Sequence, residues 1–176
     1  MRPRWATPST LVLILALAET SPVSAQAEVG LAVAAGVGMP TSDFGSAHKG
    51  GYLGNARVFI YPGHSRVGVQ VDLAYGRFAG QGGNADFKPF TAMGSLLFGS
   101  ARSRHIRPYF LAGAGLMAKG STMNEYSRFA VQGGAGLSIG SGSISAFLEA
   151  RYVSSVEAIT LASYVPILAG VVFHLR

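Results

Sequence analysis

The sequence VGVQVDLAYG, at residues 67–76, decides how this chain folds. Its odd-numbered positions hold valine, leucine and tyrosine, whereas its even-numbered positions hold glycine, alanine or polar residues. Successive side chains of a β-strand point to opposite faces, so a strand separates these two classes cleanly. A helix would mix them on every face. The stretch therefore predicts a strand with one apolar face and one small, partly polar face.

Seven further segments repeat this alternation. In the first of the eight, Leu31 and Val33 share a face opposite Gly30 and Ala32. A strand of about ten residues is the length that crosses a membrane at a tilt. The predicted strands cover residues 28–38, 51–61, 67–76, 87–98, 107–118, 128–139, 143–153 and 163–175.

The connections between these segments also alternate. The longer ones, rich in Gly, Ser, Thr, Asn and Asp, cover residues 39–50, 79–86, 119–127 and 154–162. Between them lie a turn at 61–65, a basic segment at 99–106 and a tight turn at 140–142. Long loops on one side and mostly short turns on the other are typical of outer-membrane barrels. We therefore predict an all-β fold, a closed eight-stranded antiparallel up-and-down transmembrane β-barrel with both termini on the periplasmic side.

The N-terminus has the order of a secretory signal peptide. Two arginines, Arg2 and Arg4, precede an apolar run at 11–18, and small residues follow as far as Ala27. The apolar run is far shorter than the roughly 20 residues of a spanning helix. Cleavage is expected after Ala25 or Ala27, and we favour Ala27. The expected division is a signal peptide at 1–27 and a barrel domain at 28–176.

Composition narrows the class of protein further. Charged residues make up 12% of the chain, against about 25% in ordinary soluble domains, which indicates a surface that is not entirely wet. The formal net charge of +6 is dispersed, and only Arg102, Arg104 and Arg107 cluster, so no nucleic-acid partner is expected. The absence of cysteine excludes a disulfide framework.

A soluble lipocalin-like barrel or β-sandwich is the alternative to a membrane barrel. Its apolar side chains would point inward, and its outer face would be polar. The second face of this chain is mostly Gly, Ala and Ser with a few charges. Such a face is a poor coat against water but suits the narrow interior of an eight-stranded barrel, which side chains fill. We therefore favour the membrane barrel.

Three stretches carry a resemblance to a known family. They are PYFLAGAG at 108–115, FLEARY at 147–152, and the final strand with Gly170, Phe173 and Leu175. Behind a signal peptide and in this order, they make residues 28–176 resemble the small OmpA/OmpX-type outer-membrane barrels. The final strand resembles the family's assembly signal, although Leu168 takes its polar position and Arg176 replaces the terminal aromatic residue. The resemblance implies outer-membrane lipid and lipopolysaccharide as surroundings and the barrel-assembly machinery as a partner during insertion.

Four charged residues are predicted to face inward: Arg57, Asp72, Glu149 and Arg151. Single charges in a dry interior are unfavourable, so these should pair with one another. We interpret them as a structural ionic cluster, as the resemblance also implies. The alternative is a gated pore or ion path.

The remaining polar residues predict no chemistry. The four histidines have no metal-ligand spacing, and no cofactor is expected. Lipid-modifying barrels would need Ser, His and a carboxylate on the lipid-facing side near the outer leaflet, whereas His174 is predicted at the periplasmic end.

The expected function is non-enzymatic, a structural or surface-interaction (adhesion-like) role through the outer loops. A narrow pore or small-solute channel is the alternative, and a lipid-modifying enzyme comes third. The loops contain no motif that identifies an external ligand.

Overall fold

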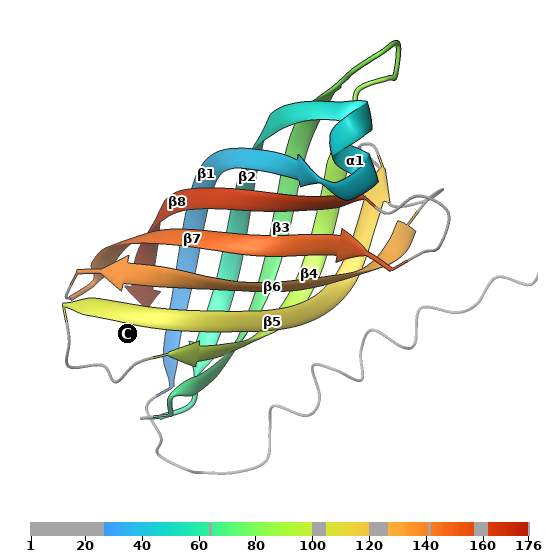
Figure 1. Ribbon diagram of the computed structural model, residues 1–176. Helices are drawn as coiled ribbons and strands as arrows, with labels where there is room; N and C mark the ends of the chain where they lie inside the picture. Colours follow the sequence, from blue (N-terminus) through green and yellow to red (C-terminus); the bar gives the residue numbers. More distant parts are fainter. Residues whose placement is uncertain are drawn as a thin grey trace, which may run out of the picture.

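A computed structural model describes residues 27–63, 65–99, 105–119, 127–140, 142–156 and 162–175. The residues expected in strands form one sheet, except for Phe87, Lys88 and Ser143, which precede β4 and β7. One short helix lies in the first connection (Figure 1). In chain order the elements are β1 (Glu28–Thr41), α1 (Ser42–Ala47), β2 (His48–Tyr61), β3 (Val67–Gly80), β4 (Pro89–Gly99), β5 (Ile106–Lys119), β6 (Ser127–Ile139), β7 (Ile144–Ser155) and β8 (Ser163–Leu175).

The sheet closes on itself. Each strand pairs antiparallel with its neighbour in sequence, and β1 also pairs with β8 from Val29↔Leu175 to Thr41↔Ser163. Closure satisfies the backbone groups that an open sheet would leave unpaired at its two edges. The predicted closed eight-stranded antiparallel up-and-down barrel is therefore confirmed.

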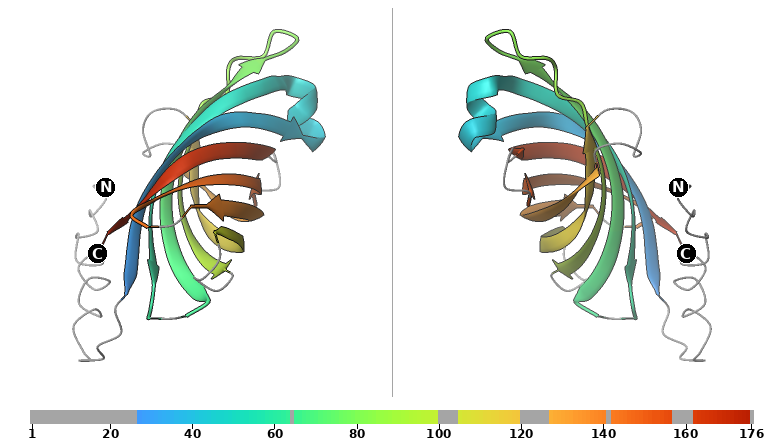
Figure 2. Two further views of the ribbon diagram at one scale, coloured as in Figure 1. Left: turned by 90° about the vertical axis from the view of Figure 1, so that its left-hand side faces the viewer. Right: turned by 90° about the vertical axis from the view of Figure 1, so that its right-hand side faces the viewer.

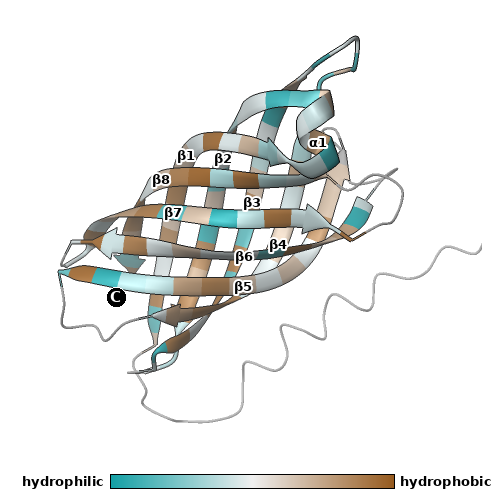
Figure 3. Cartoon of the chain, in the orientation of Figure 1, coloured by the Kyte–Doolittle hydropathy of each residue, from teal (hydrophilic) through white to brown (hydrophobic). Residues whose placement is uncertain are grey.

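The two faces of each strand differ in exposure as the sequence pattern predicts. On β3, Val71 is 61% exposed, whereas its neighbours Gln70 and Asp72 are 3% and 1% exposed. Large apolar side chains point outward on every strand, and Figure 3 shows apolar and polar residues alternating along the ribbons. No helix in the described part of the chain is long and apolar enough to cross a membrane.

The barrel has two unlike ends. We call them the helix end, which holds α1 and the β3–β4 connection, and the terminal end, where β1 begins and β8 ends. Figure 2 shows the β3–β4 connection projecting beyond α1 at the helix end. The sequence predicted an irregular loop at 39–50, but β1 and β2 run into that range and α1 joins them. Phe44 of α1 is 7% exposed, so burial of its ring fixes a helix too short to be stable alone.

Glycine lets the closing strands approach each other. A Cβ atom placed on Gly36 of β1 would overlap the backbone oxygen of Ile167 on β8. The strand pair that closes the barrel therefore requires a residue without a side chain at this position. Gly54 of β2 differs, because the nearest atom to its added Cβ is Ala34 O, at 3.8 Å.

We expect Gly36→Ala to lower the free energy of unfolding by about 1–3 kcal/mol, the usual range for overpacking. Denaturant titration of the refolded barrel, followed by gel mobility without boiling, measures the change. Gly54→Ala is the matched control and should leave the midpoint unchanged. Equal midpoints for the two variants would contradict the close approach of β1 and β8.

Candidate functional site

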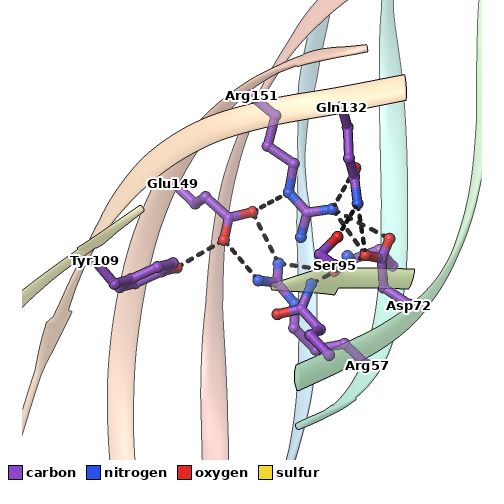
Figure 4. A network of polar contacts seen from close by, with 9 residues as sticks. Arg57, Asp72, Ser95, Tyr109, Gln132, Glu149 and Arg151 are labelled. Carbon is purple, nitrogen blue, oxygen red and sulfur yellow. Dashed lines mark hydrogen bonds and ion pairs between the residues drawn. The ribbon is translucent and has the colours of Figure 1, made fainter. Parts of the chain in front are cut away.

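The four inward charges come together in the middle of the barrel, and Glu149 of β7 accepts bonds from both arginines and a tyrosine (Figure 4). Its carboxylate accepts hydrogen bonds from Arg57 Nη1 at 2.7 Å and from Tyr109 Oη at 2.7 Å. Arg151 Nε, two residues away on the same strand face, donates to the other oxygen. Both arginines therefore neutralise one buried carboxylate, and Glu149 is only 1% exposed.

Arg151 also connects Glu149 to the second carboxylate. Its Nη1 lies 3.1 Å from both oxygens of Asp72 and 3.0 Å from Gln132 Oε1. Asp72 Oδ1 in addition accepts bonds from the side-chain amides of Gln70 at 3.0 Å and Gln132 at 3.1 Å. Together with Ser95 of β4 and Tyr109 of β5, residues from β2, β3, β6 and β7 thus form one network, which we call the ionic cluster.

The ionic cluster is electrically balanced. Two arginines face two carboxylates, and all four residues are 5% exposed or less. The desolvation penalty of buried charges is offset only when geometry is good and the remaining polar atoms are hydrogen-bonded. Here the side-chain amides of Gln70 and Gln132 and the hydroxyl of Tyr109 supply many of these additional hydrogen bonds. The Arg57 guanidinium carbon also lies 4.4 Å from the centre of the Phe147 ring, where the face of the ring attracts a cation.

Sequence reasoning named the four charges but missed their neutral partners. Gln70, Ser95, Gln132 and Tyr109 all contribute to the network. Each occupies an inward position of its strand, so the alternation that predicted inward charges contained this signal too. Alternation alone does not predict the register between strands, and the register determines which inward side chains come into contact.

An apolar cluster lies inside the barrel between the ionic cluster and the helix end. Phe78 is fully buried, and its ring packs 5.5 Å from Phe44 of α1 and 5.1 Å from Tyr164 of β8, centre to centre. The Phe44 ring also stacks on His48 at 4.4 Å and packs against Phe87 at 5.0 Å. The helix therefore inserts a ring into the barrel mouth.

An ion pair stabilises the projecting β3–β4 connection outside the barrel. Arg77 Nε donates to Asp86 Oδ2 at 2.8 Å, and the backbone N–H of Gly80 donates to Oδ1 at 3.2 Å. These bonds hold the pKa of the Asp86 carboxyl below its ordinary value. The stabilisation that these bonds contribute is fully present at a pH above the ordinary pKa of the carboxyl group. It is lost as the pH falls through the lowered pKa.

A cavity of about 430 Å³ lies at the terminal end, on the other side of the ionic cluster. We call it the terminal cavity. Arg57 and Tyr109 of the ionic cluster line its inner part, and Arg66 and Arg107 line it near the turns. Between them its walls are apolar, with residues drawn from β1, β2, β4, β7 and β8: Ala32, Phe59, Leu97, Phe147 and Val172.

His174 joins three strands beside this cavity. Its Nε2 lies 3.0 Å from Ser145 Oγ, and its Nδ1 lies 2.8 Å from Glu28 Oε1. Sequence reasoning placed His174 at this end of the last strand but did not predict its two partners. Serine, histidine and carboxylate in this order occur in hydrolases, but a nucleophile must reach its substrate, and Ser145 is 3% exposed. The contacts tie β7, β8 and β1 together.

The other predicted residues lie apart from these sites. On β8, Gly170 faces inward opposite Ala34, whereas Phe173 and Leu175 point outward near the terminal end. His105 is exposed and His64 lies outside the described residues, as does the leader up to residue 26. Within the described ranges, no group of three or more His, Asp or Glu side chains could hold a metal ion.

Comparison with known proteins supports the fold. No family model matches the sequence, and no curated protein matches it. Among solved structures, Neisserial surface protein A superimposes with a TM-score of 0.65 at 18% identity, over 84% of this chain and 97% of that one. The N-terminal β-barrel domain of Pseudomonas aeruginosa OprF gives 0.54 at 14% identity, over 85% and 100%. The chain therefore has the fold of small outer-membrane barrels, which the resemblance to OmpA/OmpX-type proteins implied.

We expect Arg151→Ala to weaken the barrel, because it leaves two buried carboxylates short of a counter-charge. Breaking a buried ion pair typically lowers the free energy of unfolding by about 3–5 kcal/mol. The measurement is the denaturant concentration, or temperature, at which the compact band disappears from an unboiled gel. Arg77→Ala removes an exposed pair and serves as control, with no expected shift. An Arg151→Ala barrel as resistant as the wild type would show that the ionic cluster does not stabilise the fold.

Proposed function

We propose that this chain is an integral outer-membrane barrel with a structural or surface-interaction role. One observation supports this most directly: large apolar side chains are exposed on the outer face of all eight strands of a closed barrel. Phe110 at 63% and Val71 at 61% are examples. Water would solvate such a surface poorly, whereas lipid tails match it. Outer-membrane lipid and lipopolysaccharide are thus the proposed surroundings.

The two barrel ends suggest an orientation. A chain exported by a cleaved leader at 1–27 would keep its terminal end in the periplasm, with the helix end outside. The last strand, with Gly170, Phe173 and Leu175, is the proposed signal for the barrel-assembly machinery. The helix end would then present α1 and the β3–β4 connection to the exterior. Loops on a rigid scaffold are the usual place for recognition, and the similar Neisserial protein is a surface protein.

Catalysis is not part of the proposal. Ser145 is buried, and its backbone belongs to β7, where it pairs with Val172 of β8. Backbone N–H groups engaged in a ladder are not available to stabilise an oxyanion. The contacts among Ser145, His174 and Glu28 are better explained as a structural link between strands.

A narrow pore is the second candidate, because the terminal cavity opens part of the barrel. Between the terminal cavity and the helix end, we propose that side chains fill the lumen. The ionic cluster crosses the middle of the barrel, and the apolar cluster with Phe78 and Phe44 follows toward the helix end. An ion path would have to separate buried charge pairs and also wet an apolar layer. We therefore favour a barrel that does not conduct.

An epitope tag tests the proposed orientation. Inserted between Gly82 and Gly83, it should be accessible to antibody on intact Gram-negative cells, because both glycines have positive φ and no atoms near an added Cβ. The matched insertion follows Gly142, which is equally open but lies at the terminal end. That tag should react only after the outer membrane is permeabilised. The reverse pattern would overturn the orientation, and a soluble tagged protein would overturn the membrane assignment.

Planar-bilayer recording separates the barrel from the pore. The purified wild-type barrel should produce no current steps under voltage. A variant that combines Arg57→Ala with Arg151→Ala tests whether the ionic cluster is the barrier. It should also stay silent, because the apolar cluster is intact. Regular steps from the wild-type protein would establish the pore and exclude a filled lumen.

A further inference from the structure

We propose that the terminal cavity is a binding site for a single-chain anionic amphiphile, with its carboxylate near Arg107 and Arg66 and its alkyl chain in the barrel. This inference goes beyond the proposed function, since it concerns the opposite end of the molecule from the loops. It rests on the volume of the cavity, on its apolar walls and on the charges at its mouth. About 430 Å³ lies in the range of sites that bind small molecules.

The walls of the terminal cavity favour an alkyl chain over a sugar or a nucleotide. Phe59, Leu97 and Phe147 line it together with Ala32 and Val172, and these five residues belong to one apolar cluster. Each is at most 8% exposed. A pocket lined mainly by apolar groups with a few polar groups at fixed positions is the usual form of a small-molecule site.

The mouth of the terminal cavity favours an anion over a cation. Arg66 and Arg107 line it, whereas the one carboxylate in its lining, Glu28, lies 2.8 Å from the ring of His174. The Nε atom of Arg107 is buried and has no hydrogen-bond partner among the described residues. A buried donor without a partner is unfavourable, and a ligand carboxylate would satisfy it.

The inner end of the terminal cavity contains a second donor of this kind. Arg57 is 5% exposed and lines the cavity, and its Nε has no partner in the part of the chain that the structure describes. Its two terminal nitrogens bond to Glu149 and so keep that carboxylate engaged within the ionic cluster. A bound anionic amphiphile would therefore not meet a free buried carboxylate at the inner end.

Octanoate is the probe, and the protein is the full barrel refolded into lipid nanodiscs. Equilibrium dialysis of labelled octanoate against loaded and empty nanodiscs separates binding to the barrel from partition into lipid. We expect saturable binding of one octanoate per barrel. Burial of each added methylene should tighten binding about fourfold from hexanoate to octanoate, until the cavity is full. Octanol and octylammonium, which lack the carboxylate, should bind at least tenfold more weakly.

Two variants with a matched control locate the site. Ala32→Leu fills space within the cavity and should abolish saturable binding, whereas Ala35→Leu adds the same side chain to the outer face of the same strand and should not. Arg107→Gln should weaken octanoate binding about tenfold or more and leave octanol unchanged, because it removes one charge-assisted hydrogen bond. A compact band on an unboiled gel shows that each variant is folded.

Three results would overturn the proposal. Octanoate uptake equal to that of empty nanodiscs would show a cavity that only water fills. Equal binding by Ala32→Leu and Ala35→Leu would place the ligand in the lipid around the barrel. Equal affinities for octanoate and octanol would remove the role of the arginines.

Discussion

The pairing of β1 with β8 constrains everything else in this structure. Once these strands share a continuous ladder from Val29↔Leu175 to Thr41↔Ser163, all edges disappear and the number of strands fixes the width of the barrel. Eight strands leave an interior wide enough only for side chains or one small ligand. Inward positions must then alternate between glycine, where backbones come close as at Gly36, and larger groups that meet across the axis. Outward positions face no such limit and are free to be large and apolar.

In a narrow interior each inward charge is buried and requires a counter-charge nearby. Arg57 of β2 is far in sequence from Glu149 and Arg151 of β7, yet the three side chains meet because the barrel axis is only a side chain's length away. Balance of charge is what makes the arrangement stable, and the amides of Gln70 and Gln132 supply bonds that the arginines alone cannot. The same constraint places the apolar cluster. Phe78 and Tyr164 are almost fully buried and pack against each other inside the barrel, and the ring of Phe44 in α1 packs against Phe78.

Alternation in the sequence was enough to predict the strands, their faces and the inward position of all four charges. The alternation was informative because the outer and inner faces of these strands require different kinds of side chain, so a period of two can only indicate a strand with these two faces. It did not predict α1, whose six residues are held by one buried ring instead of by helix propensity. Nor did it predict that Ser145, His174 and Glu28 meet, since that contact depends on closure between the first and last strands. Nor does the alternation predict the terminal cavity, because the size of a void depends on side chains from all eight strands at once.

The order of the three interior regions separates the two ends of the barrel. The terminal cavity reaches the ionic cluster through Arg57 and Tyr109, and there the polar groups are already engaged with Glu149. A molecule in the cavity could move further only by drawing Arg57 away from Glu149, which would leave a carboxylate buried and short of charge. Beyond that lies an apolar layer that offers an anion no partner. If the terminal cavity binds a ligand as proposed, that ligand would leave by the route through which it entered, and a partner bound to the loops at the helix end would not exchange contents with the cavity.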